Sequence, residues 1–418
     1  MSGVAQRMAE GLRPVVGGEL PVHLVAWDGS AAGPADAPRV VLNSPRALSR
    51  VFWHPGELGA AQAYVAGEID VEGDLTAALD HVHTVAGERG LAGIRPSPAV
   101  AAALLRLIRD VRMPPSAPPS QARVRGRLHT KFRDRLAISH HYDLSNEFYA
   151  LLLDDSMAYS CAYWRSADPA YTLADAQRDK LQLVLDKLGL VPGMTLLDVG
   201  CGWGSLSLYA AERGIRVTGV TIAAEQAAWI REQVQLRGLE ETMEVRLQDY
   251  REVTGPSGVG QFDAVASIEM GEHVGRRNYP TYAATLRRAV RPGGRVLIQQ
   301  MSRRGRHPGG GPFIESFIAP DMHMRPVGET VALLEDAGLE VRDVHALREH
   351  YVRTVDAWLA TFEENFERIV DLVGEEVARV WRLYLVGGRL AFRDRRMGVD
   401  QLLAVRPGPH TVAPVRTW

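Results

Sequence analysis

A glycine-rich turn after an apolar segment has the clearest chemical meaning in this sequence. Residues 196–204 read Leu-Leu-Asp-Val-Gly-Cys-Gly-Trp-Gly. Gly200 and Gly202 would let the backbone approach a nucleotide-like ligand closely, and Asp198 stands at the carboxyl end of the predicted strand, where parallel sheets bind ligands. A tight turn that binds no ligand is the alternative. The pattern favours a nucleotide-type cofactor in contact with Asp198, Gly200 and Gly202.

The spacing of this turn, G-x-G-x-G, departs from the dinucleotide-binding pattern G-x-G-x-x-G. With an acidic residue two positions before its first glycine, the turn resembles the first motif of class I methyltransferases. The next predicted strand ends at Thr221 and is followed by Gln226, where many nucleotide-binding sheets have an acid for the ribose hydroxyls. A neutral amide can form those hydrogen bonds, so both residues are predicted cofactor contacts.

The segments around the turn alternate between strand and helix patterns. Strands are predicted at residues 195–199, 216–220, 243–247, 262–267 and 295–300, with a helix over 206–213. This alternation predicts an α/β fold with a parallel, doubly wound sheet. Before it, shorter patterns predict a smaller amino-terminal α+β domain. They comprise strands at 22–27 and 40–42 and helices at 58–65 and 75–82.

Length and composition predict two domains and a linker. The 418 residues are too many for one ordinary core. Residues 1–88 are expected to form the α+β domain, residues 89–135 a proline-rich and basic linker, and residues 136–418 the larger domain. Two cysteines make a disulfide framework improbable, and no metal site is predicted. Because neither a leader pattern nor a spanning apolar run is evident, a cytoplasmic location is expected.

A basic segment lies in the predicted linker, while the chain as a whole has a formal charge of only −2. Its residues are Arg123, Arg125, Arg127, Lys131, Arg133 and Arg135. They could form a solvated linker face or contact anionic lipid headgroups, and the two interpretations are equally favoured. Binding to nucleic acid is not expected, because no recognition motif accompanies the charge.

Two stretches in the middle of the chain indicate a family. Residues 138–149 read Ile-Ser-His-His-Tyr-Asp-Leu-Ser-Asn-Glu-Phe-Tyr, and residues 157–164 read Met-Ala-Tyr-Ser-Cys-Ala-Tyr-Trp. Together with Gly-Glu-Ile-Asp-Val-Glu-Gly-Asp-Leu at residues 67–75, they resemble the cyclopropane fatty acid synthase family, which includes the mycolic acid cyclopropane synthases. The resemblance covers nearly the whole chain. It implies a class I (Rossmann-like) fold that binds S-adenosylmethionine, with a hydrophobic acyl-chain tunnel in residues 136–418.

The resemblance also implies a set of cofactor contacts. Asp198 is included from the position of the glycine turn, and the others match family motifs. The cofactor would contact Tyr159, Ser160, Gly200, Gly202, Thr221, Gln226, Gln248, Asp249 and Tyr250. Each also has an ordinary structural interpretation: Tyr159 could be a core residue, and Thr221 could simply end a strand.

The family's reaction requires a shielded pocket and a base. An alkene is a poor nucleophile, so the methyl group must be held in line with the double bond, and the resulting carbocation must be kept from water. In the family's cyclopropane formers, a bound bicarbonate helps to remove a proton from the transferred methyl group. Its ligands match Cys161, Glu272 and Tyr351, but Gln299 stands where those enzymes carry a histidine.

Two further departures lie beside Glu272. Glu269 stands where the family usually has glycine, and Gly271 where it usually has phenylalanine. A second carboxylate near the reaction centre could replace or reposition the base. Alternatively, Glu269 could pair with an arginine such as Arg276 or Arg277. We expect Glu272 to be essential and Glu269 to steer the outcome.

These departures favour a methylene-branched product over a cyclopropane. The resemblance is closest to the tuberculostearic acid branch, which makes 10-methylene stearoyl lipids. The predicted reaction is methyl transfer from S-adenosylmethionine to an oleoyl-type acyl chain of phospholipid, and cyclopropane formation is the alternative. A methyltransferase for small molecules and a catalytically inactive lipid-binding protein are the rival interpretations.

Several partners follow from this interpretation. They are an unsaturated acyl phospholipid and an anionic membrane surface, contacted peripherally at the inner face of the membrane. Bicarbonate as a second ligand, a reductase acting on a methylene product, and a homodimer are left open. A helical segment over residues 355–392, rich in aromatic residues, could cap the acyl tunnel or could be ordinary packing.

Overall fold

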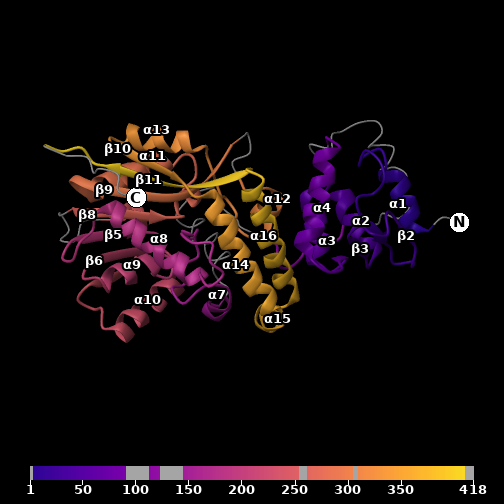
Figure 1. Cartoon of the computed structure of the whole chain (residues 1–418), viewed down its shortest axis with the longest axis horizontal. Helices are drawn as coiled ribbons and strands as arrows, with labels where there is room; N and C mark the ends of the chain where they lie inside the picture. Colours follow the sequence, from indigo (N-terminus) through magenta and orange to yellow (C-terminus); the bar gives the residue numbers. More distant parts are fainter. Residues whose placement is uncertain (1–2, 91–112, 123–144, 254–260, 305–308, 410–418) are drawn as a thin grey trace. The chain divides into compact units, whose positions relative to one another are not determined.

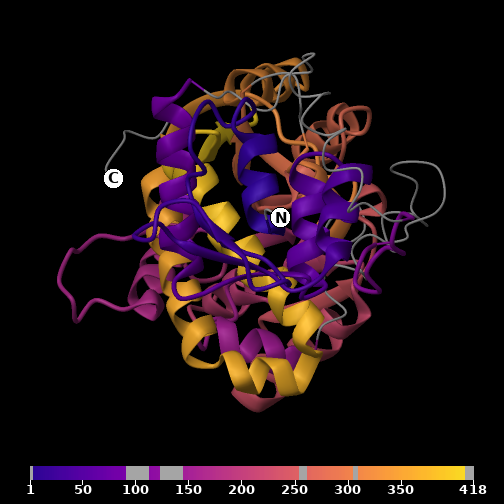
Figure 2. The same cartoon turned by 90° about the vertical axis from the view of Figure 1, so that its right-hand side faces the viewer.

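The computed structural model describes residues 3–90, 113–122, 145–253, 261–304 and 309–409. The chain forms two compact units (Figures 1 and 2). The first comprises Met1–Gln121 and Val370–Gly387, and the second comprises Ala122–Ile369 and Gly388–Trp418. The basic segment 123–135 lies outside the described residues. In the described part of the chain, no helix combines the length and apolar character needed to cross a membrane.

A seven-stranded sheet forms the centre of the second unit. Its strands are β5 Thr195–Val199, β6 Arg216–Thr221, β7 Met243–Leu247, β8 Phe262–Ile268, β9 Val290–Arg303, β10 Glu340–Ala346 and β11 Met397–Val405. Their order is β10-β11-β9-β8-β5-β6-β7. The five strands from β5 to β9 pair in parallel, whereas β11 is antiparallel to both β9 and β10.

The predicted strands are confirmed closely, and the predicted sheet direction is confirmed in part. β5 and β7 match the predicted bounds, and β9 extends beyond its predicted residues at both ends. The sheet is mixed, because β11 runs against its neighbours. Burial patterns reveal that a strand is in the core but not its direction, and an antiparallel strand near the edge of a parallel sheet is common.

Helices cover both faces of this sheet. The helices of the second unit are α7 Asn146–Leu152, α8 Leu173–Leu188, α9 Ser205–Ala211, α10 Ala224–Arg237, η1 Tyr250–Glu252, η2 Gly271–His273, α11 Tyr279–Ala289, α12 Pro312–Phe317, α13 Val327–Asp336 and α14 Arg348–Glu364, and two more helices, α15 Phe366–Val373 and α16 Glu375–Arg393, are divided between the two units. Side chains of α8, α9 and α10 form one apolar core with the sheet, and those of α11 and α13 form another. The doubly wound arrangement follows from these two cores.

Helix α8 has clear boundaries in the sequence. Thr172 and Asp175 form a capping box at its start, and Gly189 ends it with left-handed dihedral angles. Its buried face includes Gln177 and Lys180 among apolar residues such as Leu181. With Lys187, which is also fully buried, this helix therefore carries three polar side chains into the interior of the unit.

The first unit contains a small sheet and surrounding helices. They are α1 Val4–Leu12, β1 His23–Val25, β2 Ala31–Ala32, β3 Arg39–Leu42, α2 Pro45–Trp53, α3 Glu57–Val65, β4 Ile69–Val71 and α4 Leu75–Glu88. The strand order is β2-β1-β3-β4. Side chains of α1, α2 and the strands share one apolar core. This arrangement is the α+β type that the sequence pattern predicts.

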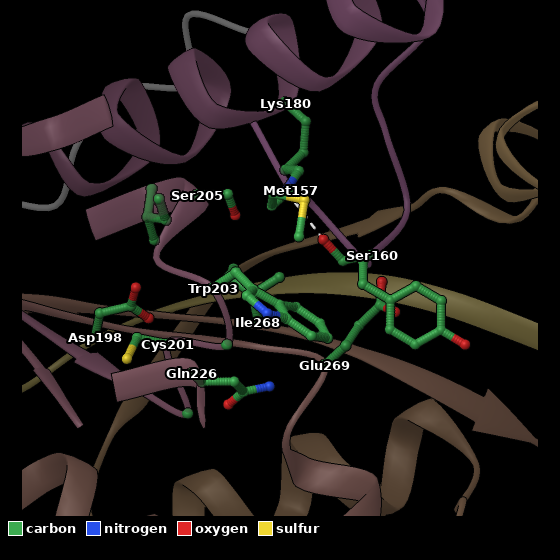
Figure 3. A pocket seen from close by; sticks show the side chains of 14 residues that line it. Met157, Ser160, Lys180, Asp198, Cys201, Trp203, Ser205, Gln226, Ile268 and Glu269 are labelled. Atoms are coloured by element: carbon green, nitrogen blue, oxygen red, sulfur yellow. Dashed lines mark hydrogen bonds between the residues drawn. The ribbon is translucent and has the colours of Figure 1, made fainter. Parts of the chain in front are cut away.

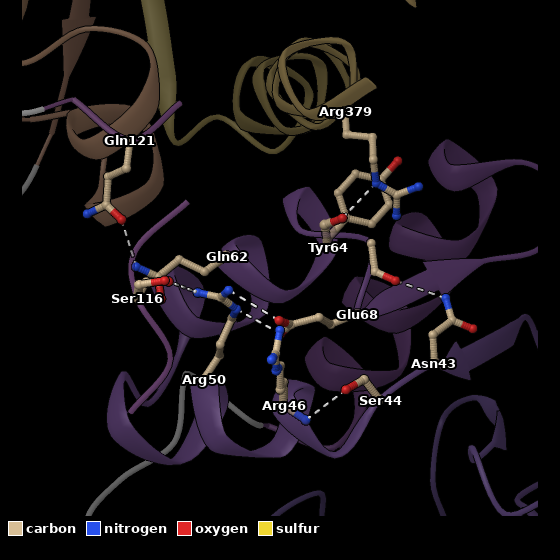
Figure 4. A network of polar contacts seen from close by, with 11 residues as sticks. Asn43, Ser44, Arg46, Arg50, Gln62, Tyr64, Glu68, Ser116, Gln121 and Arg379 are labelled. Carbon is tan, nitrogen blue, oxygen red and sulfur yellow. Dashed lines mark hydrogen bonds and ion pairs between the residues drawn. The ribbon is translucent and has the colours of Figure 1, made fainter. Parts of the chain in front are cut away.

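Buried arginines fix several segments within the first unit (Figure 4). Arg50 forms an ion pair of 2.7 Å with Glu68, and both side chains are nearly inaccessible. Arg379 of α16 donates from Nε to the carbonyl of Tyr64 at 2.7 Å, and its guanidinium carbon lies 4.2 Å from the centre of the Tyr64 ring. A late segment of the chain is thereby held to the amino-terminal helices and strands.

Candidate active site

Two adjoining cavities lie where β5, β6 and β8 end. Residues lining the first include Tyr159, Ser160, Lys180, Asp198 and Trp203 (Figure 3). Residues lining the second include Thr221, Gln248, Asp249, Tyr250 and Met270. Gly200, Gly202, Gln226 and Glu269 line both cavities. The structure thus brings all ten residues of the predicted cofactor site together at this edge of the sheet.

The glycine turn needs its glycines for two different reasons. Gly200 and Gly202 have φ angles of 77° and 54°, which favour glycine. A Cβ on Gly200 would lie 2.7 Å from Cγ of Met270, so the turn packs closely there. A Cβ on Gly202 would meet nothing within 4 Å and would point into open space. The open side of Gly202 is where a ligand can approach the backbone.

Asp198 is buried at the end of β5. Its Oδ2 accepts a hydrogen bond of 2.8 Å from the Ser207 hydroxyl. Burial raises the pKa of Asp198 to about 6, although Ser207 and Lys180 oppose the shift. A cationic ligand group beside Asp198 would stabilise its charged form.

The second cavity has polar groups that are already oriented. Thr221 donates from its hydroxyl to Gln226 Oε1 at 2.9 Å, which directs the amide nitrogen of Gln226 elsewhere. Asp249 pairs with Arg251, with Nη2 and Oδ2 2.6 Å apart. The amide of Gln248 donates to the carbonyl of Glu252 at 2.8 Å. These contacts hold the side chains at the rim in defined positions.

Glu269 is the centre of a partly buried hydrogen-bond cluster. Its Oε1 accepts from the backbone N–H of Cys161 at 2.8 Å and from Gln299 Nε2 at 2.9 Å. Its Oε2 accepts from the Tyr351 hydroxyl at 2.8 Å. Both oxygens therefore bond to these residues, and the alternative of a pair with Arg276 or Arg277 is wrong. The carboxylate oxygens of Glu269 need hydrogen-bond donors within the protein, and the exposed Arg276 and Arg277 do not supply them.

The backbone at Glu269 is unusual. Its φ of 51° lies in the left-handed region, which strains a residue with a side chain. Its N–H donates to the Gln299 carbonyl at 2.6 Å, so β9 fixes the residue through its backbone as well. Met157, which lines the first cavity, also has a positive φ of 54°. Two of the four described non-glycine residues with positive φ thus lie at the cavity wall.

Cys161 contributes through its backbone. Its thiol is completely buried and lies 3.3 Å from its neighbour's carbonyl oxygen at Ala162 and 3.7 Å from that of Leu347. Burial raises the pKa of the Cys161 thiol well above its usual value, and the nearby Glu269 adds to the shift. A thiolate is therefore disfavoured. Cys161 offers the cluster its amide N–H, which donates to Glu269, and its carbonyl oxygen, which accepts from Gln299 Nε2 at 3.2 Å.

Glu272 lies near this cluster but has fewer donors. Its Oε1 accepts from the backbone N–H of Met301, and Oε2 is buried without a hydrogen-bond partner among the described residues. Burial raises the pKa of Glu272 to about 8, and the charge of Glu269 contributes. Three donors and Lys180 favour the charged form of Glu269. Burial raises the pKa of Glu269 as well, and these groups limit the rise.

The replacement of phenylalanine by Gly271 has a local reason. A Cβ on Gly271 would collide with Oε1 of Gln300. That oxygen accepts from the Tyr279 hydroxyl at 2.7 Å, and Gln300 Nε2 donates to Thr330 at 2.9 Å. The buried chain of three side chains therefore occupies the space that a larger residue at 271 would need.

Sequence reasoning did not single out Gln177 and Lys180. Gln177 Nε2 donates to the carbonyls of Ser160 at 2.9 Å and Ala158 at 3.2 Å, which holds the loop that lines the first cavity. Lys180 Nζ donates to the Ser160 hydroxyl at 3.0 Å. A signal was available, because the helical spacing puts both polar residues on the apolar face of α8.

Aromatic side chains of the carboxy-terminal helices pack beside the site. The ring centres of Tyr159 and Trp358 lie 5.3 Å apart, and those of Tyr351 and Phe392 lie 4.4 Å apart. Trp358 and Phe362 are fully buried. These contacts position Tyr351 and Tyr159, and the acyl tunnel that this segment was expected to cap stays a prediction.

The fold defines a class of protein. A seven-stranded α/β sheet with one antiparallel strand, and a glycine turn after strand β5 in its interior, is the class I methyltransferase fold. The family model described as mycolic acid cyclopropane synthetase matches residues 129–402. The chain belongs to this family and is an enzyme of it.

Similar proteins have related names. The chain is 38% identical over 414 residues to a probable fatty acid methyltransferase of Mycobacterium tuberculosis, covering 96% of this chain and 95% of the relative. It is 34% identical over 408 residues to the tuberculostearic acid methyltransferase UfaA1 of the same organism, covering 93% and 89%. It is 36% identical over 280 residues to the cyclopropane-fatty-acyl-phospholipid synthase of Escherichia coli, covering 67% and 70%.

Solved structures agree with this assignment. The cyclopropane synthase MmaA2 from Mycobacterium tuberculosis has a TM-score of 0.61 at 29% identity, covering 67% of this chain and all of that one. The mycolic acid cyclopropane synthase CmaA1, complexed with SAH and CTAB, has a TM-score of 0.60 at 31% identity, covering 65% and 98%.

Proposed function

We propose that this enzyme transfers a methyl group from S-adenosylmethionine to the double bond of an unsaturated acyl chain of phospholipid. We propose further that its product is a methylene-branched, 10-methylene stearoyl chain. The family and the names of the similar proteins support lipid acyl chains as the substrate class. The choice of product rests on the hydrogen bonds of Glu269.

The polar groups and the open backbone of the two cavities suit the chemistry of S-adenosylmethionine. Asp198 offers a buried acid, Gly202 offers open backbone, and Gln226 offers an oriented amide for ribose hydroxyls. When bound, the cofactor supplies its methyl group as an electrophile. The residues of the chain bind it, orient it and keep water from the reacting carbon.

The observation that carries the proposal is the position of the Glu269 carboxylate. The resemblance assigns bicarbonate to ligands at Cys161, Glu272, Tyr351 and the position of Gln299. Three of these residues instead donate hydrogen bonds to Glu269. A second anion beside it would place two negative charges in one buried space, which is unfavourable. This supports a reaction in which Glu269 does the work that the resemblance assigns to bicarbonate.

A built-in base is compatible with a methylene product. Methyl transfer to one alkene carbon leaves a cation at its neighbour. A hydride then shifts from the methylated carbon to that neighbour, which moves the cation to the methylated carbon. Loss of a proton from the new methyl group leaves a double bond between this carbon and the methyl carbon, which is the methylene branch. Glu269 accepts this proton, so the carboxylate becomes a carboxylic acid and charge is conserved. Closure to cyclopropane would lose the same proton before the hydride shift.

Tyr351 and Gln299 hold the base in position. Tyr351 donates to one oxygen of Glu269, and Gln299 donates to the other. Gln299 Oε1 in turn accepts from Gln401 Nε2 at 2.9 Å, which fixes the orientation of its amide. The neutral amide cannot accept a proton at physiological pH, so it leaves that role to the carboxylate.

The test is the lipid product of a host whose phospholipids contain oleoyl chains. We expect methylene-branched lipid from the wild type by mass spectrometry. Glu269→Gln keeps the shape and removes the base, so turnover should fall at least about 100-fold. Cofactor affinity should be nearly unchanged. The exposed Glu244→Gln is the matched control and should behave as the wild type.

Glu269→Gly restores the residue that is usual in the family and also relieves the positive φ. We expect it to lower methylene formation or to shift some product towards cyclopropane, most clearly when bicarbonate is supplied and Gln299→His is added. If the wild type forms only cyclopropane lipid and Glu269→Gly changes neither rate nor product, the proposal of a methylene product is wrong.

A further inference from the structure

Helix α14 holds a chain segment, residues 161–164, that carries one of the donors to Glu269. Each backbone N–H of this segment donates to an acceptor in the second unit. The pairs are Cys161 to Glu269 at 2.8 Å, Ala162 to the Thr354 hydroxyl oxygen at 3.1 Å, Tyr163 to the Ala176 carbonyl at 3.0 Å and Trp164 to His350 Nδ1 at 2.9 Å. Two of the four acceptors are therefore side chains of α14.

Thr354 uses the whole hydrogen-bonding capacity of its hydroxyl, which is fully buried. The hydroxyl donates to the His350 carbonyl at 2.8 Å within the helix. Its oxygen accepts from the Ala162 N–H and from the Trp164 Nε1–H, each at 3.1 Å. Since a hydroxyl has one proton and two lone pairs, no capacity is left for a ligand or for water. The Thr354 side chain therefore links the segment 161–164 to α14.

The same helix carries the hydroxyl that bonds to the other oxygen of Glu269. Tyr351 and Thr354 are three residues apart, so their side chains lie on one face of α14. Tyr351 donates to Glu269 Oε2 at 2.8 Å, while Cys161, the neighbour of Ala162, donates to Oε1. One face of α14 thus positions two of the three donors to this carboxylate.

The Cys161 peptide also contacts the third donor. Its carbonyl accepts from Gln299 Nε2 at 3.2 Å, and the same nitrogen donates to Glu269 Oε1 at 2.9 Å. A shift of this peptide would therefore disturb both hydrogen bonds to Oε1. We propose that Thr354 is a positioning residue for the base, because its hydroxyl keeps the Cys161 peptide where it holds Glu269. This inference rests on the proposed function, in which Glu269 accepts the proton.

The competing interpretation is that Thr354 only stabilises the fold. The two interpretations differ in their effect on Glu269. Weaker hydrogen bonds to the carboxylate disfavour its charged form, so loss of the positioning raises the pKa of Glu269. A purely structural loss lowers the melting temperature and the amount of folded enzyme, but it leaves the pKa of Glu269 unchanged in the molecules that are folded.

A substitution at Thr354 changes no charge near Glu269. The titratable groups that act on Glu269 or feel its charge are Cys161, Lys180, Glu272 and Tyr351. All four stay in place when the neutral threonine is replaced. A change in the titration of Glu269 therefore reports on its hydrogen bonds.

The experiment is the pH profile of kcat for the full-length wild type, Thr354→Val and Thr354→Ser, with saturating S-adenosylmethionine and vesicles of dioleoyl phosphatidylglycerol. Valine keeps the shape of threonine and removes the hydroxyl. We expect kcat of Thr354→Val to fall about 10- to 100-fold, because a small displacement of a catalytic group is costly. Its acid limb should move to higher pH, and KM for S-adenosylmethionine should change less than kcat. Thr354→Ser keeps the hydroxyl and should recover most of the rate and the acid limb of the wild type.

Thr361→Val is the matched control. Thr361 lies on the same helix, and its hydroxyl donates to the Ala357 carbonyl at 3.1 Å, as that of Thr354 donates to the carbonyl of His350. In the described part of the chain, no hydrogen bond joins the Thr361 hydroxyl to the segment 161–164. We expect Thr361→Val to keep the kcat and the acid limb of the wild type.

Should Thr354→Val fail to fold, Thr354→Cys leaves a weaker hydrogen-bonding group at the same place. It should move the acid limb in the same direction to a smaller extent. An acid limb at the wild-type pH in the folded variant, or failure of Thr354→Ser to recover the rate, would overturn the positioning role. Wild-type turnover by Glu269→Gln would instead overturn the proposed function itself.

Discussion

Two carboxylates of this site, the buried Glu272 and the partly buried Glu269, differ through their hydrogen-bond donors. Glu269 receives three donors, whereas Glu272 receives the backbone N–H of Met301 and has one oxygen without a partner among the described residues. Both carboxylates lose hydrogen bonds to water on folding. Protein donors replace most of these hydrogen bonds at Glu269 but only one at Glu272. Sequence reasoning expects Glu272 to be the essential carboxylate. The geometry favours Glu269 as the base and Glu272 as a neutral neighbour.

The pH dependence of turnover follows from this difference. Burial raises the pKa of Glu269 above its ordinary value of 4.5, and its three hydrogen bonds limit the rise. Because the charged form is the base, we expect activity to be lost as pH falls through this raised pKa. The acid limb of kcat, measured with saturating lipid and cofactor, should therefore lie above pH 4.5. A limb at or below the ordinary glutamate value would contradict the assignment.

Glu272 has the opposite consequence for stability. Its pKa is about 8 in the folded protein and ordinarily 4.5, so the folded state binds more protons between these values. Stability contributed by the protonated form is therefore lost as pH rises through this window. We expect Glu272→Gln to raise the melting temperature at pH 8 more than at pH 5. The exposed Glu244→Gln is the control, and equal effects at both pH values would contradict the shift.

At the scale of elements, the turn between β5 and α9 has separate requirements at its glycines. Gly200 is needed for close packing against Met270, whereas Gly202 faces open space. We expect Gly202→Val to place a branched side chain there and to weaken S-adenosylmethionine binding at least about 10-fold through loss of the space and strain at φ 54°. Titration of a folded variant checks this. Undiminished S-adenosylmethionine binding would show that the cofactor does not lie against this turn.

Much of the catalytic domain could be predicted because its strands are short, apolar and bounded by glycines. β5 and β7 match their predicted bounds. Strands β10 and β11 were not predicted, and the direction of β11 depends on the route of the chain through α14, α15 and α16. The partners of Glu269 were missed for a similar reason: Cys161, Gln299 and Tyr351 are far apart in sequence, and their meeting depends on tertiary packing.

Lys180 shows a limit of another kind. Lysine on a helix is ordinarily exposed to solvent, so the residue type alone predicts an exposed Lys180 and not a buried one. The periodicity of α8 nevertheless puts it with Leu181 and Val184. A charged residue within an apolar stripe is evidence for a function of the buried face, provided that the helix bounds are secure.

At the scale of the whole molecule, no described helix can cross a membrane, while the proposed substrate lies in one. We propose peripheral contact with the inner face of the membrane through the basic residues of the segment 123–135. Binding to vesicles should require anionic lipid and weaken between low and physiological salt, because the attraction is screened. Co-sedimentation with anionic and neutral vesicles is the measurement. Equal binding to both at low salt would contradict it.

Most of α16 belongs to the amino-terminal unit, although it comes late in the chain. Residues 370–387 belong to the amino-terminal unit, and the chain returns to the catalytic unit at Gly388. Within the first unit, Arg379 donates to the carbonyls of Tyr64 at 2.7 Å and Ile69 at 2.9 Å. Only 8% of Arg379 is exposed, so these carbonyls cannot easily turn to water instead.

Loss of Arg379 should therefore destabilise the first unit without changing the catalytic one. We expect Arg379→Ala to lower the stability of the first unit by about 2 to 4 kcal/mol, because it removes the charged hydrogen bonds to the carbonyls of Tyr64 and Ile69 and the stacking on Tyr64. Hydrogen exchange in residues 3–90 should increase, while S-adenosylhomocysteine affinity stays unchanged. Arg368→Ala is the control, because Arg368 and its partner Glu147 are 62% and 57% exposed and their pair contributes little. If hydrogen exchange in residues 3–90 is unaffected by Arg379→Ala, then α16 does not hold the first unit together.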